Sequence, residues 1–313
     1  MPFFSIIIPT YNRAQMLTTA IDSVLKQSFS DWELIVVDDG STDNTKEVVN
    51  SYNDNRIRYI YQKNSERCAA RNNGINSSKG NYICFLDSDD YYLLNRLEKL
   101  YNEIKKREFP IAFFYTGICF EDNGIAVRRE ELPNIFKSMK EYFVTNVIGS
   151  PQVCIHKNIL LTHKYNENFS IGEDTELWIR IENERFPIIF LNQFTIIATN
   201  HIERSVNEVA QNSYKDGLKI MKFIFSKKHP GNKINPKVKR SVISGLYFGI
   251  ARHYIYNCAR FKALFYLLRS ILITPTGNQT KHKAFLFYKT LFSHKSNISE
   301  IRKYISIFLI YLL

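Results

Sequence analysis

The sequence predicts an α/β fold built on a sheet with parallel strands, followed by a helical extension. In the first ninety residues, short β-branched or aromatic runs alternate with helical patterns, which is typical of parallel strands joined by crossover helices. Polar clusters follow three of the expected strands. From about residue 210 the chain becomes basic, aromatic and helical in pattern, so we expect two parts, residues 1–210 and 211–313.

Composition favours a folded protein of a reducing compartment. Of the 313 residues 45% are hydrophobic, which is enough to bury a substantial core. The five cysteines are odd in number and include no C-x-x-C pair, so neither disulfides nor a zinc site is indicated. The apolar start, residues 3–9, is interpreted as a core strand rather than a secretory signal, and no apolar run reaches the roughly 20 residues of a membrane span. We therefore expect a cytoplasmic protein.

Apolar spacing defines the elements in order. The first four strands are expected at residues 4–8, 33–37, 57–61 and 82–86. Between the first two, Leu17, Ala20 and Ile21 recur at helical spacing, and Val48, Val49 and Tyr52 predict the next helix. Later segments predict a helix at 93–108, a strand at 111–120, a helix at 173–185 and one or two strands at 188–199.

Acidic residues follow the strand at 82–86. Asp87, Asp89 and Asp90 lie within four consecutive positions. Carboxylates this close repel one another unless a hard cation such as Mg²⁺ or Mn²⁺ compensates their charge. A solvated turn or a helix N-cap explains the same residues, so the cluster alone leaves both interpretations open. A second acidic pair, Asp38 and Asp39, follows another strand, although Asp39 before a glycine also suits a plain turn.

These clusters are expected to converge. In open α/β sheets, ligands bind outside the carboxyl ends of the strands, where residues 10–13, 38–41 and 87–90 would meet. A basic segment, Arg67 to Arg71, is interpreted as a loop between two of the clusters. A site with carboxylates, a cation and an arginine is suited to bind the nucleobase and the diphosphate of a nucleotide.

Five segments in this order resemble glycosyltransferase family 2, which has the GT-A fold. They are Ser5–Asn12, Val36–Asp43, Ala70–Gly74, Phe85–Asp90 and Gly172–Trp178. The resemblance covers about residues 3–205 and implies a Rossmann-like, nucleotide-binding mixed sheet flanked by helices. It also implies an inverting, metal-dependent transfer of a sugar from a nucleotide-sugar donor, expected to be a UDP-sugar, to a hydroxyl of a glycan or lipid-linked acceptor.

The resemblance also implies roles for individual residues. Pro9 and Tyr11 would line the nucleotide, Asp39 would accept a hydrogen bond from uracil, Arg71 would lie near the base and phosphates, Asp87 would contact the ribose, and Asp89 would hold Mn²⁺ or Mg²⁺. Asp174 would be the general base that deprotonates the acceptor. His201 would complete the metal site, although a surface histidine explains it equally well.

Three further expectations concern residues near these proposed sites. Because successive residues on a helix point about 100° apart, only one of Glu173 and Asp174 is expected to face the crevice. Asp90 is expected to cap a helix, and the alternative is a supporting position beside the metal ligands. The segment Gly149 to Gln152 is expected on the acceptor side.

The net charge of +12 comes entirely from the C-terminal part, because residues 1–214 have a balance of −5. From Lys215 onward the sequence has 19 Lys or Arg but only two acidic residues, Asp216 and Glu300, which is a balance of +17. An apolar helical stripe runs through Phe261, Leu264, Phe265, Leu268 and Leu272, and the end segment 304–313 is also apolar. A basic amphipathic helix can lie on an anionic membrane, so peripheral attachment to the inner face of the cell membrane is one interpretation, and packing on the catalytic part is the other.

Three rival functions are considered. A nucleotidyltransferase shares the α/β body and metal carboxylates, but the expected Gly-rich phosphate loop with a lysine is absent from the sequence. A non-catalytic sugar-nucleotide-binding protein would not need both acidic motifs. Nucleic acid is not an expected partner, because the sequence has no zinc-finger, helix-turn-helix or RNA-recognition signature.

Overall fold

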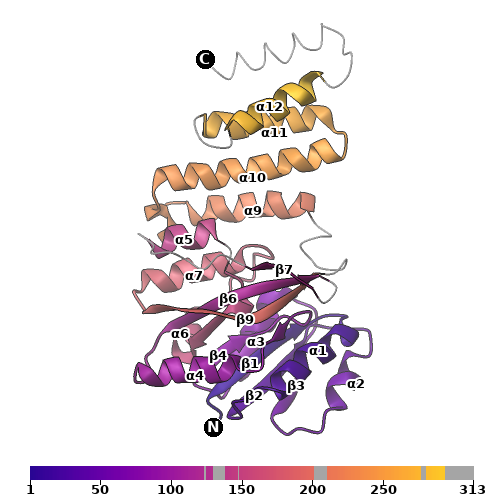
Figure 1. The fold of residues 1–313 in the computed structure, drawn as a ribbon, viewed down its shortest axis with the longest axis vertical. Coiled ribbons are helices and arrows are strands. Elements are labelled where there is room, and N and C mark those ends of the chain that lie inside the picture. The colour runs from indigo at the N-terminus through magenta and orange to yellow at the C-terminus, as the bar shows by residue number, and fades with distance from the viewer. Residues whose placement is uncertain (123–124, 130–137, 147, 201–209, 276–279, 293–313) are drawn as a thin grey trace. The chain divides into compact units, whose positions relative to one another are not determined.

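A computed structural model describes the chain apart from residues 123–124, 130–137, 147, 201–209, 276–279 and 293–313 (Figure 1). It divides into two compact units. The N-terminal unit comprises Met1–Glu208 and Ile220–Ile234, and the C-terminal unit comprises Val209–Lys219 and Asn235–Leu313. The stretch Ile220–Ile234, from the basic part of the sequence, thus belongs to the N-terminal unit.

The N-terminal unit is built on one mixed sheet, in the order β3-β2-β1-β4-β8-β6-β9-β5, with β7 beside β6. Its strands are β1 (Phe4–Thr10), β2 (Trp32–Asp38), β3 (Ile57–Tyr61), β4 (Tyr82–Phe85), β5 (Tyr91–Tyr92), β6 (Phe113–Asp122), β7 (Ile125–Arg129), β8 (Val153–His156) and β9 (Ile188–Asn200). Strands β1 to β4 are parallel to their neighbours among them, whereas β8 runs antiparallel to both β4 and β6. The expected mixed sheet is confirmed.

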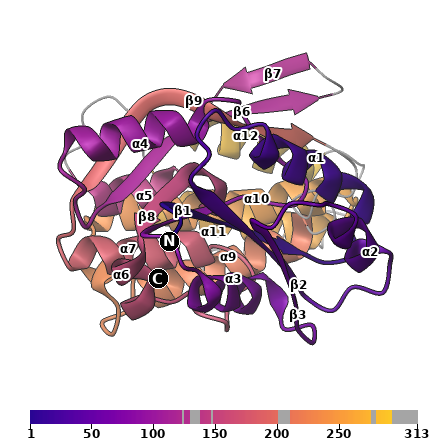
Figure 2. The ribbon, with the colours of Figure 1, turned by 90° about the horizontal axis from the view of Figure 1, so that it is seen from below.

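Helices cover both faces of this sheet. They are α1 (Ala14–Leu25), α2 (Thr45–Asn50), α3 (Glu66–Ser77), α4 (Arg96–Lys106), α5 (Met139–Thr145), α6 (Lys157–Thr162) and α7 (Glu173–Asn183), with the short helices η1 (Ser150–Gln152) and η2 (Pro230–Lys233). Figure 2 shows α1, α2 and α4 on one side of the sheet and α3, α6 and α7 on the other. The expectation of a loop at Arg67 to Arg71 is wrong, because these residues lie in α3.

Alternation along β1 explains the two layers. Ile6 and Ile8 join the core cluster that includes Leu17 of α1 and Leu97 of α4. Ile7 faces the other way, toward α3. A Cβ on Gly74 would lie 2.4 Å from Ile7 Cγ2, so α3 packs this closely on the sheet only because position 74 is glycine.

The C-terminal unit contains α10 (Pro236–Tyr256), α11 (Arg260–Ile273) and α12 (Thr280–Phe292), while α9 (Ala210–Ile224) spans the boundary between the units. Tyr247, Ile250, Tyr254 and Ala263 form its small core. Leu264 of the expected apolar stripe is buried, whereas Phe261 and Phe265 are exposed. The end segment 304–313 lies outside the described residues. Among the described helices, none is long and apolar enough to cross a bilayer.

Candidate functional site

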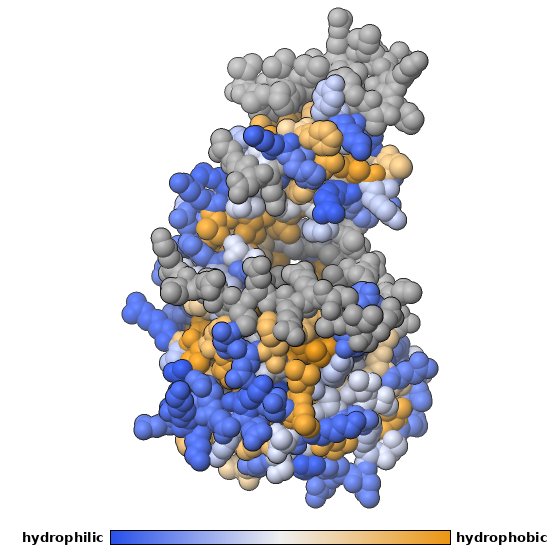
Figure 3. All heavy atoms as spheres, viewed as in Figure 1, coloured by the Kyte–Doolittle hydropathy of each residue, from blue (hydrophilic) through white to orange (hydrophobic). Residues whose placement is uncertain are grey.

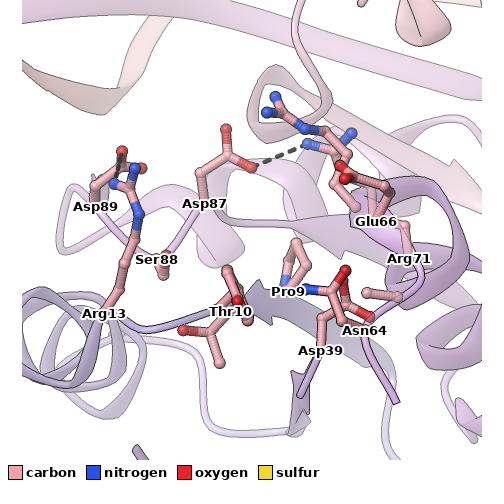
Figure 4. Close-up of a pocket in the computed structure, with 13 residues that line it drawn as sticks. Pro9, Thr10, Arg13, Asp39, Asn64, Glu66, Arg71, Asp87, Ser88 and Asp89 are labelled. Atoms are coloured by element: carbon pink, nitrogen blue, oxygen red, sulfur yellow. Dashed lines mark hydrogen bonds and ion pairs between the residues drawn. The ribbon is translucent and has the colours of Figure 1, made fainter. Parts of the chain in front are cut away.

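A polar pocket of about 530 Å³ opens at the carboxyl ends of β1, β2 and β4. Four chain segments line it: residues 9–13, Asp39, residues 64–71 and residues 87–89 (Figure 4). Six residues implied by the family resemblance are brought together here, namely Pro9, Tyr11, Asp39, Arg71, Asp87 and Asp89. His201 lies outside the described residues, so the structure gives it no place.

Strand register places the first two clusters side by side. Thr10, the last residue of β1, pairs with Asp38 of β2, and the backbone N–H of Asp39 donates to the Thr10 carbonyl at 2.8 Å. Tyr11 follows directly, lines the pocket and is 48% exposed, so it is not part of the core.

The two neighbouring aspartates have different environments. Asp38 Oδ2 accepts a 2.6 Å hydrogen bond from the Tyr59 hydroxyl, which orients it within the sheet. Asp39 lines the pocket, and its Oδ1 accepts hydrogen bonds from the Gln62 amide at 2.7 Å and the Ser65 N–H at 2.9 Å. Asp39 is therefore the better oriented of the two to accept a hydrogen bond from a ligand in the pocket.

Two arginines pair with carboxylates of the acidic loop after β4. Asp87, Asp89 and Asp90 each offer a carboxylate oxygen within 4.8 Å of the others. Asp89 pairs with Arg13 at 2.6 Å, and Asp87 pairs with Arg71 at 3.1 Å. An all-carboxylate set suits hard cations such as Mg²⁺ or Mn²⁺, so these residues fit the expected metal.

Asp90 is not a helix cap. Its Oδ1 accepts the backbone N–H of Thr199, on β9, at 3.1 Å, and the residue is buried. The next helix, α4, begins only at Arg96, with Asn95 at its N-cap position. The expectation of a cap failed because Asp90 is held by a strand that lies more than a hundred residues away in sequence.

Arg71 connects the pocket to α7. Its guanidinium is 3% exposed and lies 3.1 Å from Asp87, 3.0 Å from Glu173 and 3.7 Å from Asp174. It also lies over the Tyr165 ring, and its Nε is buried without a hydrogen-bond partner among the residues that the structure describes. Burial by itself would lower the pKa of Arg71, but the facing carboxylates, Asp174 first, raise it well above the usual value. Arg71 is therefore a fixed cation between two acidic motifs.

Both acidic residues at the start of α7 reach this arginine. The N-cap residue Gly172 has φ +74°, a left-handed conformation that glycine adopts without strain, and the helix follows at once. Glu173 and Asp174 then both approach Arg71 Nη1. Neither residue is among those that line the pocket, so the expectation that only one of the two faces the crevice stays a prediction.

Asp174 has the most perturbed environment of the described carboxylates in the site. Its side chain is 15% exposed. Burial first, and then the charge of Glu173, raise the pKa of Asp174 to about 7, against the opposing effects of Arg71 and Ser150. Asp174 Oδ2 accepts the Ser150 N–H at 3.1 Å, and Oδ1 accepts the Ser150 hydroxyl. A carboxylate oriented in this way, with a pKa near neutrality, suits a general base.

Sequence analysis missed the support beneath Ser150. Arg96 is fully buried on α4 and donates to the Pro151 carbonyl of η1 at 2.9 Å and to the Thr116 hydroxyl at 2.8 Å. The Tyr165 hydroxyl contacts the Ser150 hydroxyl at 2.6 Å. Neither Arg96 nor Tyr165 belongs to a recognisable motif, since each acts through partners that are distant in sequence.

The chain is similar to known glycosyltransferases in sequence. The family model described as Glycosyl transferase family 2 matches residues 5–201. A Campylobacter jejuni relative, named GalNAc(5)-diNAcBac-PP-undecaprenol beta-1,3-glucosyltransferase, is 27% identical over 275 residues, which cover 85% of this chain and 86% of the relative. An Escherichia coli relative, UDP-Glc:alpha-D-GlcNAc-diphosphoundecaprenol beta-1,3-glucosyltransferase WfgD, is 34% identical over 179 residues, which cover 56% of this chain and 68% of the relative.

A solved structure shares the fold. Staphylococcus aureus TarS 1–349, crystallised in complex with UDP-GlcNAc, superposes with a TM-score of 0.59 and 20% identity over 88% of this chain and 82% of that one. At this identity the likeness concerns the fold alone, which is the mixed α/β architecture implied by the GT-A resemblance. The family match, by contrast, covers well over half of the chain. The protein is therefore a glycosyltransferase, and its chain belongs to glycosyltransferase family 2.

Proposed function

We propose that the protein transfers a sugar from a UDP-sugar to a hydroxyl of a glycan or lipid-linked acceptor, with inversion at the anomeric carbon. The observation that carries the proposal is the arrangement around Arg71, which joins Asp87 in the pocket to Asp174 on α7. A pocket residue and the candidate base thus contact the same guanidinium. The names of the C. jejuni and E. coli relatives, both glucosyltransferases with undecaprenol-linked acceptors, support a lipid-linked acceptor.

The nucleotide would lie against residues 9–11 and Asp39. Tyr11 offers an exposed ring for stacking, and Asp39 offers a carboxylate that can accept the N–H of uracil. Asp87 would contact the donor ribose. Asp89 would hold Mg²⁺ or Mn²⁺, for which His201 is a further candidate ligand. When bound, the cation supplies Lewis-acid stabilisation of the charge that develops on the departing diphosphate.

The transfer would then be a single displacement. The acceptor oxygen attacks the anomeric carbon from the face opposite the diphosphate, and the bond between that carbon and the diphosphate oxygen breaks to release UDP. Asp174 takes the proton of the acceptor hydroxyl. Ser150 keeps the Asp174 carboxylate oriented through two hydrogen bonds, and Arg71 lies within 3.7 Å of that carboxylate.

A donor screen tests this proposal. We expect UDP-sugars, with Mn²⁺, to raise the melting temperature, because a ligand that binds only the folded state stabilises it. With a polyprenyl-diphosphate-linked glycan as acceptor, the enzyme should release free UDP. Release of pyrophosphate instead would support a nucleotidyltransferase, and binding without turnover on any acceptor would support a non-catalytic sugar-nucleotide-binding protein.

We further propose that residues 1–210, with the segment folded back at 220–234, carry catalysis, and that the C-terminal extension attaches the enzyme to the inner face of the membrane. Exposed apolar side chains lie on α11 and α12: Phe261, Phe265, Leu272, Phe285 and Tyr288. Lys262 and Arg269 accompany them on α11 and are also exposed. Figure 3 shows such hydrophobic side chains at the surface of the C-terminal unit among hydrophilic ones.

Vesicle flotation tests the attachment. We expect the full chain to float with anionic vesicles more than with neutral ones, because each Lys or Arg near an anionic surface contributes about 1 kcal/mol. Replacing Phe265 and Phe285 together by Ser should weaken binding roughly tenfold, since each ring loses part of its insertion. Leu161→Ser, at an exposed position of α6, is the matched control and should bind as the wild type does. Equal binding by the double variant, or no preference for anionic lipid, would argue against the attachment.

A further inference from the structure

Arg13 lies at the edge of the donor pocket, opposite Arg71. It occupies the N-cap position of α1, and its Nη1 lies 2.6 Å from Asp89 Oδ2. The two side chains are 21% and 13% exposed, and both line the pocket. Figure 4 shows the Arg13 and Asp89 side chains close together, apart from the Arg71 and Asp87 pair. The two carboxylates expected to meet the cation and the donor are therefore paired with different arginines, and Arg71 also contacts Glu173 and Asp174.

The pairing affects how a cation can bind. Asp89 Oδ2 lies at hydrogen-bond distance from a guanidinium, so a divalent ion on that oxygen would meet another positive charge at close range. Because the pair is partly shielded from water, the repulsion is screened less than on an open surface. A cation can use Asp89 fully only if Arg13 turns away.

The donor offers Arg13 another partner. Guanidinium groups bind phosphate oxygens through paired, charge-assisted hydrogen bonds, which are stronger than those between neutral groups. The diphosphate of a donor in this pocket would lie near Asp87 and Asp89, within the same set of lining residues as Arg13. A diphosphate and a cation arriving together can therefore exchange partners with the ion pair.

We propose that Arg13 is a positioning residue that occupies Asp89 in the absence of donor and moves onto the donor diphosphate when the cation binds. The inference rests on the proposed function, because it needs the cation and diphosphate in this pocket. Its consequence is a coupling of the two ligands. Free Mn²⁺ binds weakly because Arg13 competes for Asp89, and UDP strengthens Mn²⁺ binding by drawing Arg13 away.

The first test is a titration of the full chain with Mn²⁺ alone. Binding is measured by calorimetry or by the electron paramagnetic resonance signal of the free ion. Arg13→Gln should bind Mn²⁺ roughly three- to tenfold more tightly than the wild type, the range given by loss of one partly exposed charge pair. Arg13→Lys, which keeps the charge, should stay closer to the wild type. Arg107→Gln, which breaks an Arg–Glu pair on α4 outside the pocket, is the matched control and should change nothing.

The second test measures the coupling. UDP should increase Mn²⁺ affinity by a larger factor in the wild type than in Arg13→Gln, and by linkage Mn²⁺ should increase UDP affinity by the same factor. Uridine, which lacks the diphosphate, should give the same small coupling in both proteins. If Arg13→Gln does not fold, Arg13→Met, which also removes the charge, replaces it in both measurements, and the same changes in Mn²⁺ affinity and UDP coupling are expected.

Mn²⁺ affinity in the neutral variants that equals or falls below that of the wild type would overturn the inference and leave Arg13 as a structural partner of Asp89. An equal UDP coupling in wild type and variant would overturn it as well. Failure of the proposed function looks different, because the wild type itself would then bind no UDP in the presence of Mn²⁺.

Discussion

Asp174→Asn is expected to reduce the rate of sugar transfer by about 10²- to 10⁴-fold, the usual cost of losing a general base. The substitution keeps the size of the side chain and one acceptor oxygen for Ser150, so the geometry of η1 and α7 should persist. The amide cannot take the proton of the acceptor hydroxyl. The loss should therefore appear in kcat, while UDP binding stays nearly unchanged.

The pH profile provides a second readout of the same residue. Because burial, with the charge of Glu173, raises the pKa of Asp174 to about 7, the base is protonated and inactive below that pH. The wild-type kcat/KM should fall about tenfold for each pH unit below about 7, and the residual rate of Asp174→Asn should lack this limb.

The melting temperature of Asp174→Asn provides a control, because the substitution should lower activity without lowering stability. A carboxyl whose pKa is raised on folding costs stability as pH rises from its ordinary value of 3.8 through about 7. The permanently neutral Asp174→Asn should therefore not melt below the wild type at pH 8, so low activity could not be blamed on unfolding. Asp216→Asn, an acidic residue of the C-terminal unit paired with Lys219, is the matched control. If Asp174→Asn retained a third or more of the wild-type kcat, Asp174 would not be the base.

Asp89→Ala is expected to abolish the cation-dependent thermal stabilisation by UDP. The cation would connect Asp89 to the donor diphosphate, so removing this carboxylate leaves the diphosphate without that link. Stabilisation by a ligand grows as RT ln(1 + [L]/Kd), so a shift seen at a hundredfold excess over Kd, about 2.7 kcal/mol, should largely disappear. The measurement is the melting temperature with UDP and Mn²⁺, compared with UDP and EDTA.

A matched control separates this effect from simple loss of an ion pair. Asp54 also pairs with an arginine, Arg56, at 2.7 Å, but it lies outside the pocket. Asp54→Ala should melt lower yet keep the full UDP shift. If the UDP shift survived both EDTA and Asp89→Ala, the assignment of the cation to Asp89 would be wrong.

Much of the fold follows from local patterning. The strands expected at 4–8, 33–37, 57–61 and 82–86 appear within two residues of the observed bounds at either end. Three of them, β1, β2 and β4, are mainly apolar runs that are almost wholly buried, whereas β3 is a half-buried strand at the edge of the sheet. The sequence analysis did not predict the helix at Glu66–Ser77, because the side of this helix that is buried is partly polar. Its buried side includes Arg71 and Asn72, and Asn72 donates to the Tyr165 carbonyl and to Glu167. A helix whose inner face is polar and hydrogen-bonded gives no amphipathic signal.

The insertion of β8 was also not predictable. Its four residues, Val153–His156, pair antiparallel with both β4 and β6 and so connect the parallel strands to the rest of the sheet. Nothing in so short a segment specifies two partners, because strand pairing depends on hydrogen bonds between backbones that are distant in sequence.

The sequence by itself indicated the type of chemistry, since the acidic residues that line the pocket and Tyr11 come directly after the ends of β1, β2 and β4, which parallel pairing brings together. Only the tertiary structure decided which partner each charge meets. Asp90 binds a backbone N–H on β9, Arg71 joins Asp87 to both acids of α7, and Arg13 pairs with Asp89. The physical reason is that periodicity records whether a position is buried. A buried charge, in contrast, is stabilised by particular groups supplied from elsewhere in the fold.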